Sequence, residues 1–355
     1  MSRIMRLPMY VVDAFASRPF SGNPAAVCLC MPGVLLDDKV RQRIAAEMNH
    51  SETAFIEPLD GSSSAAAGRD EFSSASAFRL RWFTPTCEVP CCGHATLASA
   101  AVLFQARNNP HPAISFHTLS GELVVSRAAS ATPPADPAAD DPSSSPPPPP
   151  LALSLTLPLY DPVDPVPACA ADPRGPLARA CAGSLPVAEV RYCGAGGLNY
   201  VLMALAEGVG RRQLEALRPD FEAMGRAAPA EEVHGVIVCV RTGSDQPSAE
   251  ATAEVEGEEE VCSRFFAPWM GINEDPVTGS AHAVLGPYWE ATLRPAGKGG
   301  SGSGGVGRGG GRVGPMRMRQ CSARGGDVLV EVMREEGRVR VSGTATLVLE
   351  GTLRL

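Results

Sequence analysis

The chain has 355 residues, a formal net charge of −8 and 44% hydrophobic residues. This length and apolar content favour two domains with substantial cores, while the acidic balance argues against a nucleic-acid partner. The length excludes a small disulfide-rich secreted fold, and eleven cysteines, an odd number without metal-type spacing, predict reduced thiols. Because the sequence shows neither a signal-peptide core nor an apolar run of membrane-span length, we expect a soluble cytoplasmic protein without a membrane partner. An atypical organellar address stays open.

The N-terminal half is predicted to mix strands and helices. Residues 37–49 should form an amphipathic helix, because apolar side chains recur every four residues and Asp37 or Asp38 can cap its start. Residues 61–77 are rich in Ser, Ala and Gly and are expected to form an expanded hairpin loop. An apolar central helix is predicted over residues 95–105. Strands are predicted at residues 10–15, 51–56 and 79–83.

The predicted domain boundary is the stretch 129–150, which ends in five prolines and cannot pack into a core. The N-terminal domain would span residues 1–128 and the C-terminal domain residues 151–355, and the last strand could cross back to the first domain. Further strands are predicted at residues 152–157, 199–205, 235–240 and 328–333, with alternation resuming at 339. Flexible inserts are expected near residues 61–77, 243–260 and 297–314.

Two segments of the chain resemble each other in sequence. Arg81-Trp-Phe-Thr-Pro85 precedes Cys92-Gly-His-Ala-Thr-Leu-Ala-Ser-Ala100, and Arg264-Phe-Phe-Ala-Pro268 precedes Thr278-Gly-Ser-Ala-His-Ala-Val-Leu285. This repeat predicts an α+β protein of two similar halves, each a mostly antiparallel sheet wrapped around one helix. The backbone N–H groups at the two Gly-led helix starts can bind an anion. We therefore expect them to face each other across a cleft that holds a small carboxylate.

Glu52 is a candidate general acid/base. It stands in His50-Ser-Glu-Thr-Ala-Phe55, between small polar residues and apolar residues that enter the core. A partly shielded carboxylate in such a place can take up a proton and return it. On the local pattern alone, the favoured interpretation is a capping or edge-strand Glu in water.

His94, Asp275 and Ser280 are further candidates at the repeated helix starts. His94 follows Gly93, and its imidazole either hydrogen-bonds the turn or points into the cleft. Asp275 precedes a proline, so it is either a turn former or a functional carboxylate. Ser280 follows Gly279 and either caps the helix or helps its backbone N–H groups to bind an anion.

Cys92 suggests a rival mechanism, in which two opposed thiols racemise an amino acid. The second half has no thiol near Gly279, where the aligned residues are Asp275-Pro-Val-Thr, so one thiol is missing. We therefore expect Cys92 to be a small buried residue. Ser280 is not favoured as a nucleophile, because no Gly-x-Ser-x-Gly turn surrounds it.

Seven motifs, spread over both halves, together resemble those of the phenazine-biosynthesis-like (PhzF) family, in particular its eukaryotic branch. Only the inserts fall outside this resemblance. The motifs are Asp13-Ala-Phe15, Ser21-Gly-Asn-Pro-Ala-Ala-Val27, Asn49-His-Ser-Glu-Thr-Ala-Phe55, Arg81-Trp-Phe-Thr-Pro85, Glu88-Val-Pro with Cys92-Gly-His-Ala-Thr96, Ser120-Gly-Glu122 and Glu274-Asp-Pro-Val-Thr-Gly-Ser-Ala-His282.

The resemblance implies the diaminopimelate-epimerase-like fold, with the active site in a cleft between two similar domains. It also implies a homodimer and an isomerase that works without cofactor or metal on a small carboxylic acid. Glu52 resembles the family's general acid/base, and His94 and Asp275 resemble residues that hold the substrate's polar groups and assist proton movement. The positions that resemble substrate-binding ones are Asn23, Gly93, Gly279 and Ser280.

The combined prediction is an isomerase that shifts a proton within a small unsaturated or amino carboxylic acid, with Glu52 as its only acid/base. One carboxylate suffices for this reaction, because the same base can serve two carbons on one face of the substrate. Two alternatives stay open. One is an epimerase or racemase of a small amino-acid-like acid, and the other is a non-catalytic metabolite-binding or scaffold protein.

Overall fold

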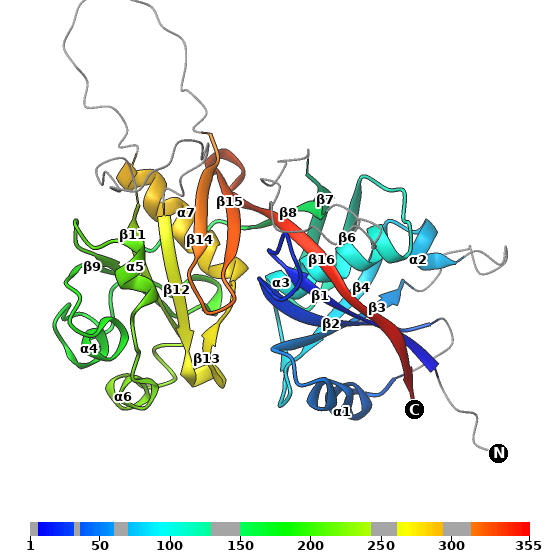
Figure 1. Cartoon of the computed structure of the whole chain (residues 1–355), viewed down its shortest axis with the longest axis horizontal. Helices are drawn as coiled ribbons and strands as arrows, with labels where there is room; N and C mark the ends of the chain where they lie inside the picture. The colour runs from blue at the N-terminus through cyan, green and yellow to red at the C-terminus, as the bar shows by residue number, and fades with distance from the viewer. Residues whose placement is uncertain (1–5, 32–35, 60–69, 129–149, 243–260, 294–313) are drawn as a thin grey trace, which may run out of the picture. The chain divides into compact units, whose positions relative to one another are not determined.

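The computed structural model describes residues 6–31, 36–59, 70–128, 150–242, 261–293 and 314–355 (Figure 1). The chain divides into unit 1, Met1–Thr156 with Ser342–Leu355, and unit 2, Leu157–Val341. Strands β8 (Leu151–Pro158) and β16 (Arg338–Arg354) each run from one unit into the other.

The observed division differs from the boundary expected at residues 129–150. The strand before this stretch, β7 (Gly121–Arg127), pairs with β8, so the stretch connects two neighbouring strands of unit 1. Residues 129–149 themselves lie outside the described residues, as do the expected inserts at 243–260 and 297–313. The last strand does cross back, because residues 342–355 belong to unit 1.

Unit 1 is a sheet closed around one buried helix, α3 (Gly93–Ala101), which a π-helical turn, Val102–Ala106, extends. The sheet's other strands are β1 (Arg6–Ala14), β2 (Asn23–Leu29), β3 (Glu52–Pro58), β4 (Ala77–Phe83), β5 (Glu88–Val89) and β6 (Ala113–Thr118). They run in the order β1-β2-β3-β4-β6-β7-β8-β16, and β16 pairs back with β1. The residues of α3 are mostly small and are buried on every side of the helix, which explains why it can contact β1, β2, β3 and β7 together (Figure 1).

The outer face of this sheet is covered by α1 (Asp38–Met48). Val40, Ile44 and Met48 pack into a cluster with residues of β1 to β4, such as Phe55. The side chain of Asp37 accepts a hydrogen bond from Val40 N, which caps the helix start. The predicted amphipathic helix is therefore confirmed, with its apolar face toward the sheet.

The last part of the predicted loop 61–77 contains a short helix. Residues 61–69 lie outside the described residues, but α2 (Glu71–Ser74) follows them as a short helix. Asp70 caps it, and Phe72 is fully buried and stacks on Phe78 with ring centroids 5.9 Å apart. One buried aromatic side chain thus anchors a segment whose composition predicted only a loop.

Unit 2 contains the rest of the same continuous sheet, in the order β16-β15-β14-β12-β11-β10-β9, with β13 added beside β12. Its strands are β9 (Val187–Cys193), β10 (Tyr200–Leu205), β11 (Gly235–Arg241), β12 (Val261–Ala267), β13 (Ile272–Asp275), β14 (Met316–Gln320) and β15 (Gly326–Met333). Its helices are α4 (Pro176–Ala182), α5 (Arg211–Glu215), α6 (Phe221–Ala227) and α7 (Gly279–Leu293). Short 3-10 turns occur at Ala195–Gly197, Pro268–Met270 and Arg334–Glu336.

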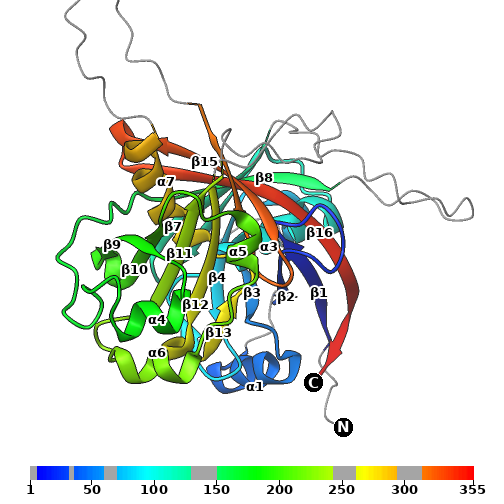
Figure 2. The same cartoon turned by 60° about the vertical axis from the view of Figure 1, so that its left-hand side comes forward.

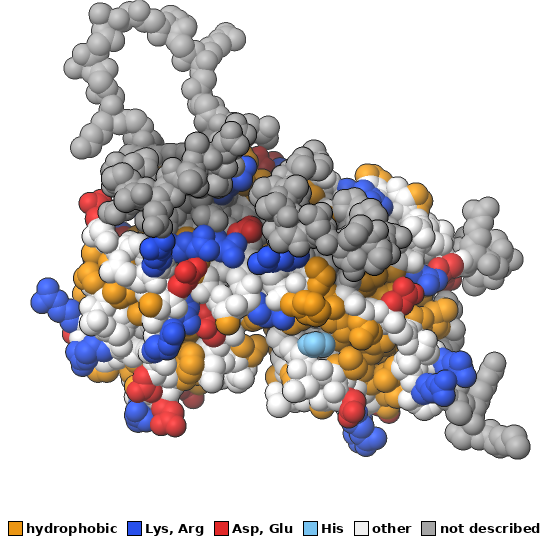
Figure 3. Space-filling view, in the orientation of Figure 1, with side chains coloured by type: hydrophobic (Ala, Val, Ile, Leu, Met, Phe, Trp, Pro, Cys, Tyr) orange, Lys and Arg blue, Asp and Glu red, His pale blue; other side chains and the backbone are white. Residues whose placement is uncertain are grey.

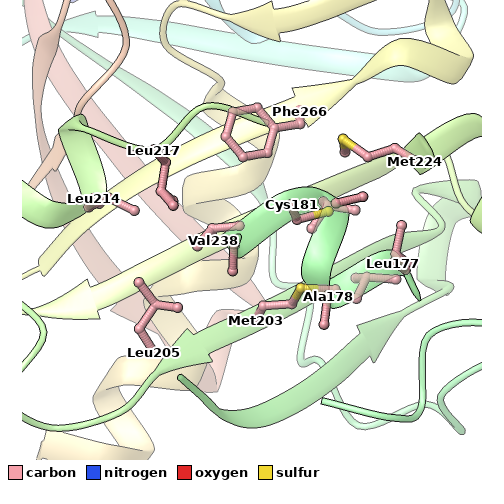
Figure 4. Packing of buried hydrophobic residues seen from close by; sticks show 14 of the residues in the cluster. Leu177, Ala178, Cys181, Met203, Leu205, Leu214, Leu217, Met224, Val238 and Phe266 are labelled. Atoms are coloured by element: carbon pink, nitrogen blue, oxygen red, sulfur yellow. The ribbon is translucent and has the colours of Figure 1, made fainter. Parts of the chain in front are cut away.

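Both faces of the unit 2 sheet are buried. Alternate residues of β10 to β12, such as Met203, Val238 and Phe266, pack against α4, α5 and α6 (Figures 2 and 4). On the opposite face, α7 approaches so closely that a Cβ on Gly286 would lie 2.8 Å from Val330 Cγ1. This half therefore has helices on both faces of its sheet. The sequence predicted α7 but not α4, α5 or α6.

The two units repeat the same strand topology. In unit 1, β2 and β3 are parallel, β4 is antiparallel to β3, and β4 pairs in parallel with β6, which continues into the antiparallel β7. In unit 2, β10, β11, β12, β14 and β15 have the same relations in the same order. The short strands β5 and β13 occupy matching places, each directly before the buried helix. The predicted duplication is therefore confirmed, and the fold is α+β.

On the face shown in Figure 3, positive and negative side chains are interspersed among uncharged ones. No helix among the described residues combines the length and the apolar character needed to span a membrane.

Candidate active site

In unit 1, the ends of three elements bring candidate residues together. Asn23 is the first residue of β2 and Glu52 the first residue of β3, and these strands are parallel neighbours. His94 is the second residue of α3. All three side chains are buried: Glu52 is 8% exposed, His94 4% and Asn23 0%. The structure thus places three predicted site residues in one cluster.

The imidazole of His94 lies at the centre of this cluster. Its Nε2 lies 3.2 Å from Glu52 Oε2 and 3.3 Å from Ser51 Oγ. Its Nδ1 lies 3.1 Å from Asn23 Nδ2 and 3.4 Å from Cys92 Sγ. His94 therefore connects an amide and a thiol on one side to a carboxylate and a hydroxyl on the other.

Burial determines the charge of His94. Removal from water lowers the pKa of its imidazole from 6.5 to about 3, so the ring is neutral near pH 7. The contact with Glu52 is consequently that of a neutral ring with a carboxyl group, and a neutral imidazole carries only one N–H.

The ligand atoms of Glu52, Cys92 and His94 lie within 4.8 Å of one another, a distance that invites a test for a metal site. However, the thiol contacts Nδ1 and the carboxylate contacts Nε2, on opposite sides of the ring. The three side chains thus form a row of contacts across the ring, which also suits proton-transfer chemistry.

In unit 2, Asp275 forms the centre of a second polar cluster. It ends β13, is buried, and accepts a short hydrogen bond from Thr278 Oγ1. Gln320, fully buried on β14, accepts from Thr278 N at 2.9 Å and donates to the Asp275 carbonyl at 2.6 Å. The amide of Gln320 thereby fixes the turn between β13 and α7.

Gly279 and Ser280 are the first two residues of α7. Ser280 Oγ lies 3.1 Å from the hydroxyl of Tyr200, whose ring packs edge-on against Phe265. Because the first N–H groups of a helix have no partner within it, this start combines backbone and hydroxyl donors suited to a carboxylate. Gly93 gives α3 an equivalent start in unit 1.

An arginine–carboxylate pair supports each helix start. Arg81 donates to both oxygens of Glu88 at 2.6 and 2.7 Å, and Arg264 donates to both oxygens of Glu274 at 2.7 Å. Each guanidinium also lies over the aromatic ring two residues further on, 5.2 Å from that of Phe83 in unit 1. These pairs hold β5 on β4 and β13 on β12, and so determine where the following helix begins.

The pairs also explain the unequal spacing in the repeat. Glu88 to His94 aligns with Glu274 to Ser280 without a gap, so the three extra residues of the second copy lie before Glu274, in the turn around Pro268–Met270. In this alignment Thr278 holds the place of Cys92. The structure therefore agrees with the sequence that the second half lacks a matching thiol.

Some members of these clusters have signals in the sequence and others do not. Ser51 directly precedes Glu52 within the motif His50-Ser-Glu-Thr-Ala-Phe55, so the sequence could have identified it. Tyr200 and Gln320 are distant from the motifs, and only the pairing of β10 and β14 into the sheet brings them to Ser280 and Asp275.

The chain matches the PhzC-PhzF family, described as phenazine biosynthesis-like protein, over residues 12–351. It belongs to this family. It is 38% identical over 349 residues to the human phenazine biosynthesis-like domain-containing protein, covering 98% of this chain and 99% of that protein. An uncharacterized isomerase of Pseudomonas aeruginosa is 35% identical over 351 residues, covering 99% of this chain and all of the relative.

Solved structures identify the fold. A PhzF-family protein of Enterococcus faecalis superposes with a TM-score of 0.68 at 29% identity, covering 99% of this chain and 100% of that one. A hydroxyproline epimerase of Agrobacterium vitis shares the fold with a TM-score of 0.52 at 12% identity, covering 99% and 93%. The PhzF-family chain thus has the diaminopimelate-epimerase-like fold, and membership and fold together support an activity of the isomerase or epimerase type.

Proposed function

We propose that this PhzF-family protein is a cofactor-independent isomerase that shifts a proton within a small unsaturated or amino carboxylic acid. Glu52 would act as the single acid/base. The observation that carries the proposal is the contact between the buried Glu52 carboxyl and the neutral His94 ring, 3.2 Å apart. A shielded carboxyl group beside a neutral imidazole is an arrangement suited to reversible proton transfer.

In the proposed reaction, the Glu52 carboxylate removes a proton from a carbon next to an unsaturated or electron-withdrawing group. The electron pair left on that carbon delocalises toward the substrate's carboxylate. Protonated Glu52 then returns the proton to a second carbon on the same face, which restores the carboxylate of the enzyme. The bond order shifts along the substrate, and no atom is gained or lost.

The remaining predicted residues would bind the substrate. Backbone N–H groups at Gly93 and Gly279, with the hydroxyl of Ser280, would stabilise the carboxylate as negative charge spreads over it. Asp275 would accept a hydrogen bond from an amino or hydroxyl substituent. Its own position is held by Thr278 and Gln320, so it is presented in a fixed geometry.

The test is isotope incorporation measured by mass spectrometry in D2O, with a panel of small unsaturated and amino carboxylic acids. Wild type is compared with Glu52→Gln, and the matched control is Glu47→Gln, which alters an exposed carboxylate on α1. We expect deuterium uptake or an isomeric product with wild type and control, and a loss of about 10²- to 10⁴-fold in Glu52→Gln. Ligand-induced thermal stabilisation should persist in all three proteins.

Other outcomes separate the alternatives. A normal rate in Glu52→Gln would contradict the assigned base. Deuterium entering a stereocentre with inversion would indicate an epimerase with a second base. If an acid stabilises wild type but never exchanges a proton, the chain is a metabolite-binding protein.

A further inference from the structure

Asn23 can be assigned a role through its two amide contacts. Its side chain is fully buried, and its Nδ2 lies 3.1 Å from His94 Nδ1. Ser51 Oγ donates to its Oδ1 at 3.4 Å, which agrees with the NH2 group facing the imidazole. An amide NH2 can only donate, so Nδ1 of His94 must be the acceptor in this contact.

A second donor lies at the same nitrogen. Cys92 Sγ is 3.4 Å from His94 Nδ1, within reach of a weak S–H donation. Because the buried ring is neutral and carries one proton, that proton must be on Nε2 when Nδ1 accepts. Nε2 is the nitrogen that lies 3.2 Å from Glu52 Oε2.

We propose that Asn23 is a positioning residue that holds His94 as the neutral Nε2–H tautomer and thereby places its single N–H at the nitrogen that contacts Ser51 Oγ and lies 3.2 Å from the Glu52 carboxylate. The assignment of the tautomer stands on the contacts alone. Its catalytic consequence rests on the proposed function: a protonated Nε2 at this distance favours the ionised base electrostatically, whereas the other tautomer would set a nitrogen lone pair against the carboxylate oxygens. Asn23 would therefore act through His94, rather than by binding the substrate.

His282 in unit 2 offers an internal reference for the opposite tautomer. It is fully buried, and its Nδ1 lies 2.8 Å from the carbonyl oxygen of Thr278. A carbonyl only accepts, so this ring carries its proton on Nδ1. Burial lowers its pKa from 6.5 to about 4, so it too is neutral near pH 7. One protein should thus contain one buried histidine of each tautomer.

The experiment is long-range 1H–15N correlation NMR on the full-length protein with 15N-labelled histidine at pH 7, which distinguishes protonated from unprotonated ring nitrogens. His94→Gln and His282→Gln variants assign the two sets of signals. We expect Nε2–H for His94 and Nδ1–H for His282. Nδ1–H or an imidazolium at His94 in the wild-type protein would overturn the proposal without any variant.

Substitutions at Asn23 then test whether this residue selects the tautomer of His94. Asn23→Asp offers an acceptor to Nδ1 and should convert His94 to Nδ1–H or imidazolium, while Asn23→Ala should leave a mixture of tautomers. The signals of His282 should remain unchanged in both, and thermal unfolding of each variant shows that it is folded. If folded Asn23→Asp retains the Nε2–H signature, Asn23 does not select the tautomer.

The same variants separate this inference from the proposed function. Should Glu52→Gln retain full turnover while the tautomer is as expected, the proposed reaction fails and the positioning role survives. Should Glu52 prove essential while His94 has the other tautomer, the positioning role fails alone. With both intact, Asn23→Asp should lower turnover at least 10-fold and shift its pH profile, while ligand-induced thermal stabilisation persists.

Discussion

His94 and Ser280 hold the same position in the two halves of the chain, each the second residue of a helix that begins with glycine. Upstream of each lies a glutamate, Glu88 or Glu274, that is held by an arginine through two hydrogen bonds. A common framework therefore presents an imidazole in one half and a hydroxyl in the other. The duplicated scaffold has diverged in its chemistry while retaining its geometry.

The buried histidines predict a loss of stability in mild acid. Unfolded histidine takes up a proton near pH 6.5, whereas burial lowers the pKa of His94 to about 3 and that of His282 to about 4. Between these values the unfolded state binds more protons, so the free energy of unfolding falls as the pH decreases from 6.5 toward 4. Each histidine contributes about 1.4 kcal/mol per pH unit in that window. Urea unfolding between pH 7 and 4.5 measures the slope.

Two variants isolate this effect from the titration of carboxylates. His282→Asn can keep a donor toward the Thr278 carbonyl and should flatten the pH dependence by about one histidine's share. His117→Asn alters an exposed ring on β6 and should leave the slope unchanged. Equal slopes in His282→Asn and wild type would show that His282 is not a buried neutral group.

The two arginine pairs should differ in their importance for stability. The Arg264 side chain is 8% exposed and also donates to the carbonyls of Leu214 and Leu217, whereas the Arg81 side chain is 19% exposed. Arg264→Met leaves Glu274 without its guanidinium partner and should cost about 3–5 kcal/mol of unfolding free energy. Arg81→Met should cost about 1 kcal/mol, because water screens its partners more. Chemical denaturation compares the two, and equal losses would contradict the ranking.

Gly286 should not tolerate even a methyl group, although alanine is the better helix former by about 1 kcal/mol. The added Cβ would lie 2.8 Å from Val330 Cγ1 and 3.3 Å from Val332 Cγ2, closer than packed side chains allow. We expect Gly286→Ala to destabilise the protein by about 1–3 kcal/mol. The double variant Gly286→Ala with Val330→Ala should be more stable than the sum of the two single changes. Additive losses would mean that α7 does not press on β15 at this point.

Gln320 should matter for the geometry of Asp275. It donates to the Asp275 carbonyl and accepts from Thr278 N, and it is fully buried. Gln320→Met keeps the volume but removes both hydrogen bonds, so we expect a loss of about 2–3 kcal/mol in unfolding free energy. Gln320→Glu keeps an acceptor for Thr278 N and sets a carboxyl group against the Asp275 carbonyl. If Met and Glu variants both unfold like wild type, the amide does not hold this turn.

Local sequence patterns predicted the parts of the fold that depend on local chemistry. The spacing of Val40, Ile44 and Met48 predicted α1, and the small apolar residues after Gly93 predicted the buried α3. Helices α5 and α6 were missed because they have only five and seven residues, too short for a periodic pattern. Burial of single side chains such as Leu214 and Met224 holds them on the sheet.

The candidate site was foreseeable to the extent that its residues lie in motifs. Asn23, Glu52 and His94 each stand in a distinctive motif, and the structure brings them together. The contact of Cys92 with Nδ1 was not foreseeable, because it depends on the orientation of the ring. Gln320 lies 45 residues after Asp275, and only the parallel pairing of β12 and β14 brings them together.

The path of β16 has a consequence for how the protein is made on the ribosome. β1 is synthesised before unit 2, yet one of its edges pairs with residues 345–354, which are synthesised after the whole of unit 2. Until then β1 presents an open row of backbone donors and acceptors, the kind of edge that recruits another strand. The order of translation therefore makes unit 2 the first half able to finish folding, and the half that contains Glu52 the last.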